Sequence, residues 1–187
     1  MPDVRPLSPD TWDAYAALIE RHKGVWGGCW CIGFHTRAFA GAEANRETKR
    51  QMVEAGTTHA ALVFDGGACI GWAQYGPTAS LPEIKNRKAY ESSCEGDLPD
   101  WRVTCFFTDA RHRKAGVSAD ALAGAVDLIA RSGGGTVEGY PEAVEGQKTS
   151  AGFLYCGTLG VFERAGFTAN RRIGKHRWVA RRTVEAA

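Results

Sequence analysis

The sequence predicts an α/β (α+β) fold, a mixed β-sheet with helices on both faces. Three observations carry this prediction. The chain has 187 residues, and we expect residues 1–187 to form a single domain. Apolar residues recur at helical spacing in some segments and form short β-branched or aromatic runs in others. These segments follow one another as β-α-α-β-β and then β-α-β-α-β-β, an order that favours a mixed sheet.

Composition narrows the functional classes. The sequence is 44% hydrophobic and 24% charged, with a net charge of +2, so no overall charge points to nucleic acid or to a membrane surface. The N-terminal residues lack the apolar core of a secretory signal, and no apolar run is long enough to span a bilayer. We therefore expect a cytoplasmic protein. In that compartment its six cysteines would stay reduced.

The first half of the chain begins with helical signals. Ser8-Pro9-Asp10 combines a capping serine, a proline and an acid, which predicts a helix from there to about His22. The glycine-rich and aromatic segment 24–35 breaks this pattern. A second helix is expected over 42–55, closed by Gly56.

A hairpin and a surface excursion follow. Two apolar runs, 59–64 and 68–75, flank an Asp-Gly-Gly turn and predict paired strands. Residues 77–100 lack periodicity and predict a surface excursion, with a short helix over 83–90. The run 101–108 is β-branched and aromatic, which predicts a buried strand.

The second half alternates helices and strands. A wide apolar face predicts a helix over 116–130, and glycines close it. A strand is expected at 136–140 and a helix at 154–165. The chain should end with two paired strands, 167–173 and 176–182.

The stretch after the strand that ends near Thr108 carries the most chemical information. A short basic loop with Arg113, Lys114 and Gly116 leads directly into a helix. Unpaired N–H groups at the positive end of a helix dipole suit a pyrophosphate, and Gly116 permits close approach of the main chain. Ser118 adds a hydroxyl. The alternative is an ordinary strand-to-helix turn with a solvated basic face. The spacing fits neither a Walker A loop nor a dinucleotide-binding fingerprint.

Two motifs resemble those of the GNAT superfamily of acyl-CoA N-acyltransferases. Residues 113–118 (RKAGVS) are similar to its Arg/Gln-x-x-Gly-x-Gly/Ala motif, with Ser118 at the last small position. Residues 162–167 (FERAGF) resemble its Phe-Tyr-x-x-x-Gly-Phe helix end. The segments GGCWC and VEGYP resemble a bacterial subgroup of small GNAT proteins without a well-defined substrate.

The resemblance implies a mostly antiparallel sheet that is splayed at the cofactor site. It implies acetyl-CoA as cofactor, CoA as product, and direct attack by a primary amine of a small molecule or peptide in a ternary complex. A homodimer is a further family expectation. The implied cofactor-binding residues are Phe106, Phe107, Thr108, Arg113, Lys114, Ala115, Gly116, Val117 and Ser118.

The catalytic residues are harder to assign. The family's usual tyrosine acid falls on Phe162, which cannot donate a proton. Tyr155 is the first alternative acid and Tyr140 the second, although either ring also suits core packing. Glu138 is the first choice of base if burial raises its pKa. One alternative is that Glu138 has a structural role, with arginine satisfying its carboxylate. Another is that a water relay takes the proton in place of a dedicated base.

The segment from Trp26 to His35 holds a Trp-Cys cluster. Cys29, Cys31 and His35 lack a fourth ligand and the usual spacing of a structural zinc site, so we expect no metal. By the resemblance this segment forms the acceptor-binding wall, and the alternative is a hydrophobic plug. The residues assigned to the wall are Trp26, Trp30, Phe34 and His35.

Two other functional classes stay open. The first is a non-catalytic acyl-CoA-binding or regulatory domain, which Phe162 favours. The second is a cysteine-based metal or redox protein. The basic C-terminal run at 171–182 alternates along paired strands, which is typical of a solvated face rather than a nucleic-acid site.

Overall fold

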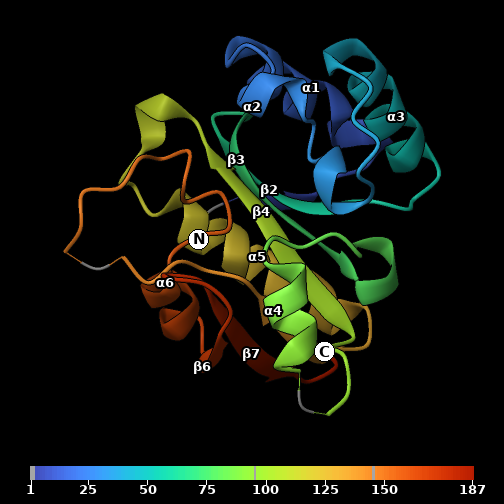
Figure 1. Cartoon of the computed structure of the whole chain (residues 1–187). Coiled ribbons are helices and arrows are strands. Elements are labelled where there is room, and N and C mark those ends of the chain that lie inside the picture. The colour runs from blue at the N-terminus through green and yellow to red at the C-terminus, as the bar shows by residue number, and fades with distance from the viewer. Residues whose placement is uncertain (1–2, 95, 145) are drawn as a thin grey trace.

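A seven-stranded mixed sheet forms the centre of the protein, with strand order β1-β2-β3-β4-β5-β7-β6 (Figure 1). The structure, a computed structural model, describes residues 3–94, 96–144 and 146–187. Every neighbouring pair is antiparallel except β4 and β5, which are parallel, so the predicted mixed, mostly antiparallel sheet is confirmed. The strands are β1 Asp3–Pro6, β2 His59–Asp65, β3 Ala68–Pro77, β4 Trp101–Thr108, β5 Gly135–Gly139, β6 Thr168–Arg172 and β7 Trp178–Val184.

Helices cover both faces of the sheet, as predicted. One face carries α5 and α6, and the other carries α1 and α3 over β2 to β4 and α4 over β5 and β7 (Figure 1). The α-helices are α1 Trp12–Arg21, α2 Val25–Gly28, α3 Ala42–Glu54, α4 Arg87–Ser92, α5 Val117–Arg131 and α6 Leu159–Arg164. Short 3-10 turns are η1 Pro9–Thr11, η2 Ile32–Phe34, η3 Thr78–Ser80 and η4 Ala110–His112.

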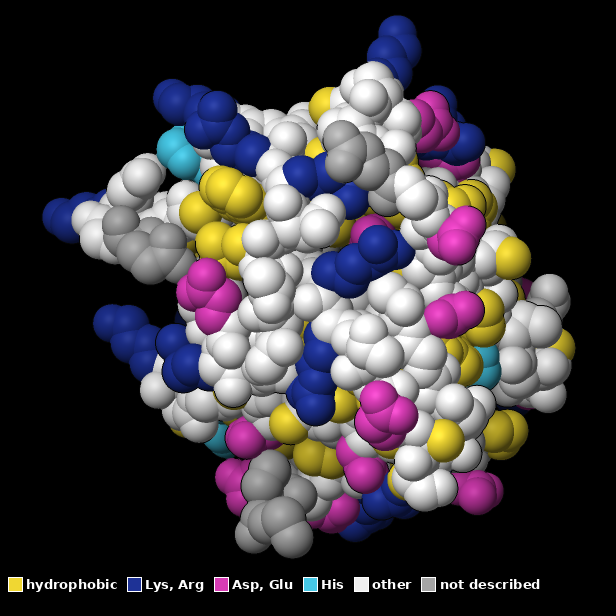
Figure 2. Space-filling view, turned by 90° about the horizontal axis from the view of Figure 1, so that it is seen from below, with side chains coloured by type: hydrophobic (Ala, Val, Ile, Leu, Met, Phe, Trp, Pro, Cys, Tyr) yellow, Lys and Arg dark blue, Asp and Glu magenta, His cyan; other side chains and the backbone are white. Residues whose placement is uncertain are grey.

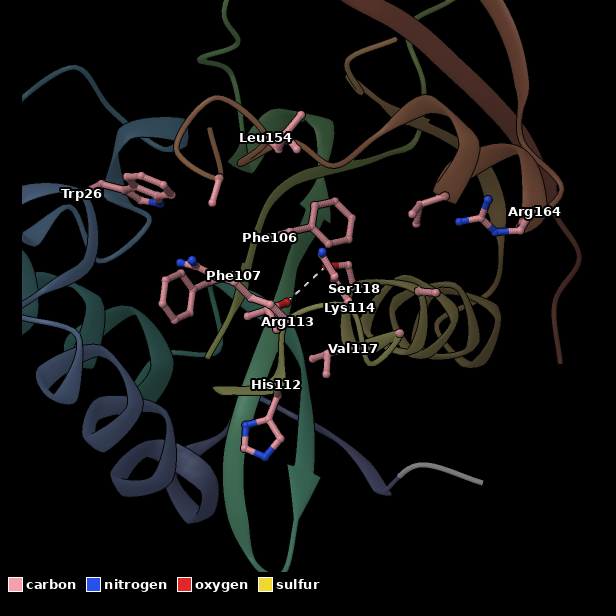
Figure 3. Close-up of a pocket in the computed structure, with 15 residues that line it drawn as sticks. Trp26, Phe106, Phe107, His112, Arg113, Lys114, Val117, Ser118, Leu154 and Arg164 are labelled. Carbon is pink, nitrogen blue, oxygen red and sulfur yellow. Dashed lines mark hydrogen bonds between the residues drawn. The ribbon is translucent and has the colours of Figure 1, made fainter. Parts of the chain in front are cut away.

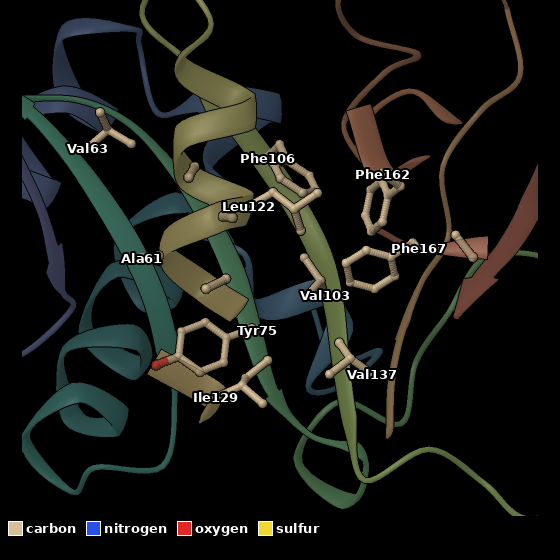
Figure 4. Packing of buried hydrophobic residues seen from close by; sticks show 14 of the residues in the cluster. Ala61, Val63, Tyr75, Val103, Phe106, Leu122, Ile129, Val137, Phe162 and Phe167 are labelled. Carbon is tan, nitrogen blue, oxygen red and sulfur yellow. The ribbon is translucent and has the colours of Figure 1, made fainter. Parts of the chain in front are cut away.

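Strand alternation separates two cores. Ala73 and Phe106 face α5, whereas Trp72 and Cys105 face α1. On the α5 side, aromatic rings from the strands and α6 meet edge to face, with 5.8 Å between the ring centroids of Phe106 and Phe162 (Figure 4). Burial of such rings supplies much of the driving force for folding.

The sheet opens between its two parallel strands. Only Trp101–Val103 of β4 pairs with Val137–Gly139 of β5, and β4 then continues alone on that side to Thr108. The register between β3 and β4 also shifts, because Thr104 is inserted between the pairs Tyr75–Val103 and Gln74–Cys105. A bulge of this kind bends the strand that contains it and increases its local twist. The splay implied by the resemblance is therefore present.

One predicted helix is wrong in its first half. The helix expected over 154–165 begins only at Leu159. Gly157 before it has φ +82°, and the Tyr155 carbonyl accepts a hydrogen bond of 2.6 Å from the Phe106 N–H on β4. The 151–156 segment therefore occupies the open side of β4 as a loop.

The charges on the surface are mixed, in agreement with the small net charge of +2. In Figure 2 basic and acidic side chains share the face, and neither sign covers it all. None of the helices in the described part of the chain is both long and apolar enough to cross a membrane.

Candidate functional site

A pocket lies where the C-terminal end of β4 meets the first turn of α5 (Figure 3). Its volume is about 410 Å³, within the range of ligand pockets. Eight of the nine residues predicted to bind the cofactor line this pocket, and the ninth, Ala115, does not. The lining residues are Trp26, Phe106, Phe107, Thr108, His112, Arg113, Lys114, Gly116, Val117, Ser118, Ala119, Ala151, Leu154, Val161 and Arg164.

A buried carboxylate anchors the loop before α5. Asp109 is fully buried and accepts hydrogen bonds from the Arg111 N–H at 2.9 Å and from Arg21 Nη2 at 2.9 Å. The Arg111 side chain, followed by Arg21, holds the pKa of Asp109 well below its ordinary value. This fixed charge sets the direction in which the chain leaves β4.

The loop ends in left-handed backbone. Lys114 has φ +65° and Gly116, the residue that caps α5, has φ +85°. Only glycine adopts this conformation without steric cost, which explains Gly116 at the cap. The first N–H groups of α5 have no partner within the helix and lie at its positive end, a suitable place for an anion.

The helix start is held close to the sheet. A Cβ atom placed on Gly71 of β3 would lie 2.5 Å from Val117 Cγ1, so only glycine permits this approach. At the same level the hydroxyls of Thr108 and Ser118 are 3.2 Å apart and hydrogen-bonded (Figure 3). The Ser118 hydroxyl thus joins α5 to β4.

Three basic side chains border the pocket. Arg113 and Lys114 come from the loop, and Arg164 comes from the last turn of α6 (Figure 3). Together they favour an anionic ligand. Our sequence analysis missed Arg164. Its only signal was a basic residue two positions before the Gly-Phe of the second motif.

The edge of β4 provides main-chain groups for a second part of a ligand. Phe106 directs its N–H away from β3, towards Tyr155. Because hydrogen-bonding direction alternates along a strand, Thr108 faces the same way, whereas Phe107 directs its main-chain groups to β3. The main chain of Phe107 is therefore not free to bind a ligand, although Phe107 lines the pocket as predicted.

The acceptor wall expected at 24–35 is only partly present. Val25 and Trp26 have positive φ values of 40° and 49°, which is unusual for such residues. Trp26 is 43% exposed, lines the pocket and lies against Gly152 of the opposite loop. Phe34 is near Tyr155, with 6.2 Å between ring centroids.

Trp30 does not line this pocket. It is 4% exposed, and its ring stacks on Trp12 at a centroid distance of 5.8 Å. For Trp30 the hydrophobic-plug interpretation is the right one, because α1 and the sheet cover its ring.

His35 joins a buried polar network instead of the pocket. Its Nδ1 lies 2.7 Å from the Ser80 carbonyl, and its Nε2 lies 2.9 Å from Gln74 Nε2 and 3.1 Å from Thr58 Oγ1. Burial, followed by the charge of Lys49, lowers the pKa of His35 from 6.5 to about 4. The imidazole is therefore neutral, with its proton on Nδ1 and Nε2 as acceptor.

The cysteines of this segment are packed as thiols. Cys31 is buried, and its N–H donates to Cys29 Sγ at 3.3 Å. A hydrogen bond with Cys105 raises the pKa of the Cys31 thiol, and burial adds to the effect. Such thiols are chemically inert. The described residues contain no group of three His, Cys, Asp or Glu side chains suited to a metal ion.

None of the three catalytic candidates lines the pocket, and two of them are fully buried away from it. Glu138 is 1% exposed, accepts a hydrogen bond of 2.8 Å from the Tyr90 hydroxyl and lies 3.4 Å from Arg181. Tyr140 is equally buried, and its hydroxyl is 3.4 Å from Glu138. This arrangement favours the structural role for Glu138, in which Arg171 and Arg181 neutralise its charge although its Oε1 accepts no hydrogen bond, and neither Glu138 nor Tyr140 lines the pocket.

Tyr155 lies beside the open edge of β4. Its ring lies 5.3 Å below the Arg177 guanidinium, and burial raises the pKa of its hydroxyl. Phe162 is completely buried against Gly139, at the position of the family's usual tyrosine. Tyr155 itself does not line the pocket, although its neighbour Leu154 does.

The splayed sheet, the glycine-capped α5 and the pocket between them define a class of fold. The protein has the GNAT acyl-CoA N-acyltransferase fold. No protein-family model and no curated protein matches the sequence.

Solved structures share this fold at low sequence identity. A protein from Desulfovibrio desulfuricans assigned to the GNAT acetyltransferase family has a TM-score of 0.55 at 18% identity, over 98% of this chain and 99% of its own. A mosquito arylalkylamine N-acetyltransferase-like protein has a TM-score of 0.55 at 14% identity, over 98% and 100%. An N-acetyltransferase from Staphylococcus aureus has a TM-score of 0.53 at 11% identity, over 99% and 98%.

Proposed function

We propose that the protein is an N-acetyltransferase that moves an acetyl group from acetyl-CoA to a primary amine of a small molecule or peptide. The observation that carries the proposal is the pocket at the start of α5, where the first N–H groups of this helix and basic side chains meet the part of β4 that β5 does not pair with. Structures with the same fold include N-acetyltransferases.

The residues of the chain fit acetyl-CoA. The N–H groups of Lys114 and of residues 116–118 would bind its pyrophosphate, with Arg113 and Arg164 adding charge. Phe106 and Thr108 would bind the pantetheine amides through their main chain. When bound, acetyl-CoA supplies an acetyl thioester that is activated towards an amine.

The loop at 151–156 must move for this binding. The Phe106 N–H already donates to the Tyr155 carbonyl at 2.6 Å, so a pantetheine carbonyl has to replace that acceptor. The exchange conserves one hydrogen bond, and its cost is set by the contacts that hold the loop, such as Trp26 on Gly152 and Arg177 over the Tyr155 ring. We propose that this loop opens when the cofactor binds.

Proton transfer rests on Tyr155 and water. The raised pKa of Tyr155 keeps its phenol protonated at neutral pH, so it can donate to a departing thiolate. Arg171 and Arg181 lie 3.8 and 3.4 Å from the Glu138 carboxylate and neutralise it. We therefore propose that the ammonium proton passes to water rather than to Glu138.

Calorimetric titration with acetyl-CoA and with CoA tests the cofactor site. The double variant Arg113→Ala/Gly116→Asp should bind at least about tenfold more weakly, because it removes a cation and places an anion at the helix N-terminus. The control Arg131→Ala/Gly33→Asp makes the same changes at exposed positions outside the pocket and should bind normally. Absence of binding to the unaltered protein would overturn the proposal.

A second candidate function is a non-catalytic acyl-CoA-binding domain, which the buried Phe162 favours. Release of CoA thiol in the presence of a panel of primary amines separates the two. Turnover that Tyr155→Phe lowers, with CoA affinity unchanged, supports the enzyme. Tight CoA binding without turnover for any amine favours the binding domain.

A further inference from the structure

A buried arginine near the start of β4 has no role in the site described above. Arg102 is 5% exposed. Its Nη1 donates to the Leu81 carbonyl at 2.7 Å, and its guanidinium lies 5.5 Å from the ring centroid of Tyr90. Its Nε is buried and has no hydrogen-bond partner. A donor left in this state costs free energy unless a ligand satisfies it.

The charge of Arg102 also lacks a carboxylate partner and faces two aromatic rings instead, with 5.5 and 6.0 Å to the ring centroids of Tyr90 and Tyr140. No carboxylate among the described residues lies within ion-pair distance of it, although Glu138 is its neighbour in register on β5. The Glu138 carboxylate is already shared by Arg171 and Arg181 at 3.8 and 3.4 Å. Two guanidinium groups thus share one buried carboxylate, and a third, that of Arg102, lies on the neighbouring strand. This excess of positive charge is unfavourable in a low-dielectric interior and favours an added anion.

Arg102 lines a second pocket. The pocket has a volume of about 320 Å³, and apolar side chains contribute much of its lining. At its rim Arg87 Nε and Glu91 Oε1 pair at 2.6 Å, so these exposed charges neutralise each other. The apolar and aromatic lining residues are Ala79, Pro82, Ile84, Tyr90 and Leu98.

This pocket is separate from the candidate cofactor site. The two share no lining residue. Arg102 precedes Thr108 by six residues, about 20 Å along a strand. A ligand here would therefore occupy a second site.

We propose that this pocket binds a small carboxylate with an apolar body. The carboxylate would pair with the guanidinium of Arg102, a group whose planar shape suits this contact. The apolar body would lie against Pro82, Ile84 and Leu98. This proposal goes beyond the acetyltransferase assignment and does not depend on it.

Titration of the full-length protein with sodium benzoate tests the proposal, with the ligand-induced shifts of arginine Nε–H resonances as the readout. Benzoate should bind saturably with a dissociation constant of about 1 mM or lower, the affinity expected of a fragment of this size. Benzamide keeps the ring but lacks the charge, and inorganic phosphate keeps the charge but lacks the ring. Both should bind at least about tenfold more weakly.

Two variants locate the site. Arg102→Met removes the cation at similar volume, and benzoate binding should be lost. Because Arg102→Met can also disturb the core, Ala79→Phe provides a second test of the site. Ala79 is exposed, and a phenylalanine there blocks the pocket from outside. Ala79→Phe should also abolish benzoate binding and leave thermal stability unchanged.

The proposal is overturned if the unaltered protein shows no saturable benzoate binding. It is also overturned if benzamide or phosphate binds as tightly as benzoate, or if folded Arg102→Met and Ala79→Phe bind benzoate normally.

Discussion

The two walls of the candidate site are built differently. The proposed cofactor wall consists of β4, a short loop and α5, three elements in direct succession along the chain. The proposed acceptor wall combines residues 24–35 with the loop at 151–156, which are far apart in sequence and largely irregular. Regular elements fix the first wall through main-chain geometry. The second depends on left-handed backbone and a buried polar network, so we expect it to be the more easily disturbed.

Gly28→Ala should have the largest effect on stability, and it acts on the acceptor wall. Gly28 has φ +82°, and an added Cβ would collide with Ala42 at the start of α3. We expect a loss of about 3 kcal/mol in unfolding free energy, from overpacking together with backbone strain. Urea unfolding measures it.

The same variant tests whether the two walls are independent. If they are, folded Gly28→Ala protein keeps its CoA affinity. Ala42→Gly in the same chain should relieve the collision but not the strain, and so restore about half of the loss. A CoA affinity that falls together with stability would contradict the division into two walls.

Gly71→Ala is the matching change on the cofactor wall. The new Cβ would lie 2.5 Å from Val117 Cγ1 and 2.7 Å from the Phe107 carbonyl oxygen. We expect a stability loss of about 2 kcal/mol and a CoA affinity reduced at least about tenfold, because the first turn of α5 is displaced. Gly33→Ala, where a Cβ meets nothing within 4 Å, is the control for both measurements. An unchanged CoA affinity in Gly71→Ala would show that the first turn of α5 does not bind the cofactor.

The difference between the walls also explains what the sequence could predict. The cofactor wall follows from local signals: an apolar strand, a basic loop, a glycine cap and an amphipathic helix. The sequence could not show that the Phe107 main chain faces β3, because that direction depends on the bulge at Thr104 and on pairing with β3.

The acceptor wall depends on contacts that sequence spacing does not contain. Trp30 was assigned to the wall because exposed and buried tryptophans look alike in sequence. The helix predicted at 154–165 failed in its first half because a tertiary hydrogen bond from Phe106 to Tyr155 outweighs local helix propensity. For the same reason the sequence could not predict the role of Glu138. That role depends on Arg171 and Arg181, which are far from Glu138 in sequence and lie on β6 and β7.

The pH dependence of stability sharpens the comparison. The pKa of His35 is about 4 in the folded protein, whereas its ordinary value is 6.5. Between these pH values the imidazole is therefore protonated in the unfolded chain and neutral in the folded protein. Stability should therefore fall as pH decreases from 6.5 towards 4, by up to about 3 kcal/mol. The lowered pKa of His59, caused by burial and by Lys49, adds in the same direction.

His35→Gln should flatten this part of the stability curve, measured by urea unfolding at several pH values. On the cofactor wall, Asp109 has a lowered pKa, so its contribution is retained until the pH falls below about 4. Asp109→Asn should therefore leave the slope between pH 6.5 and 4 intact. A slope that survives in His35→Gln would mean that other groups cause the acid sensitivity.

The smallest expected effect on stability is that of Trp26→Ala. The side chain is 43% exposed, so its removal should cost less than about 1 kcal/mol. It contacts Gly152, however, and therefore helps hold the 151–156 loop against β4. If that loop must open for the cofactor, loosening it should speed amide hydrogen exchange at Phe106 and leave CoA affinity equal or higher. Slower exchange, or CoA binding that weakens markedly, would instead make Trp26 a direct part of the cofactor site.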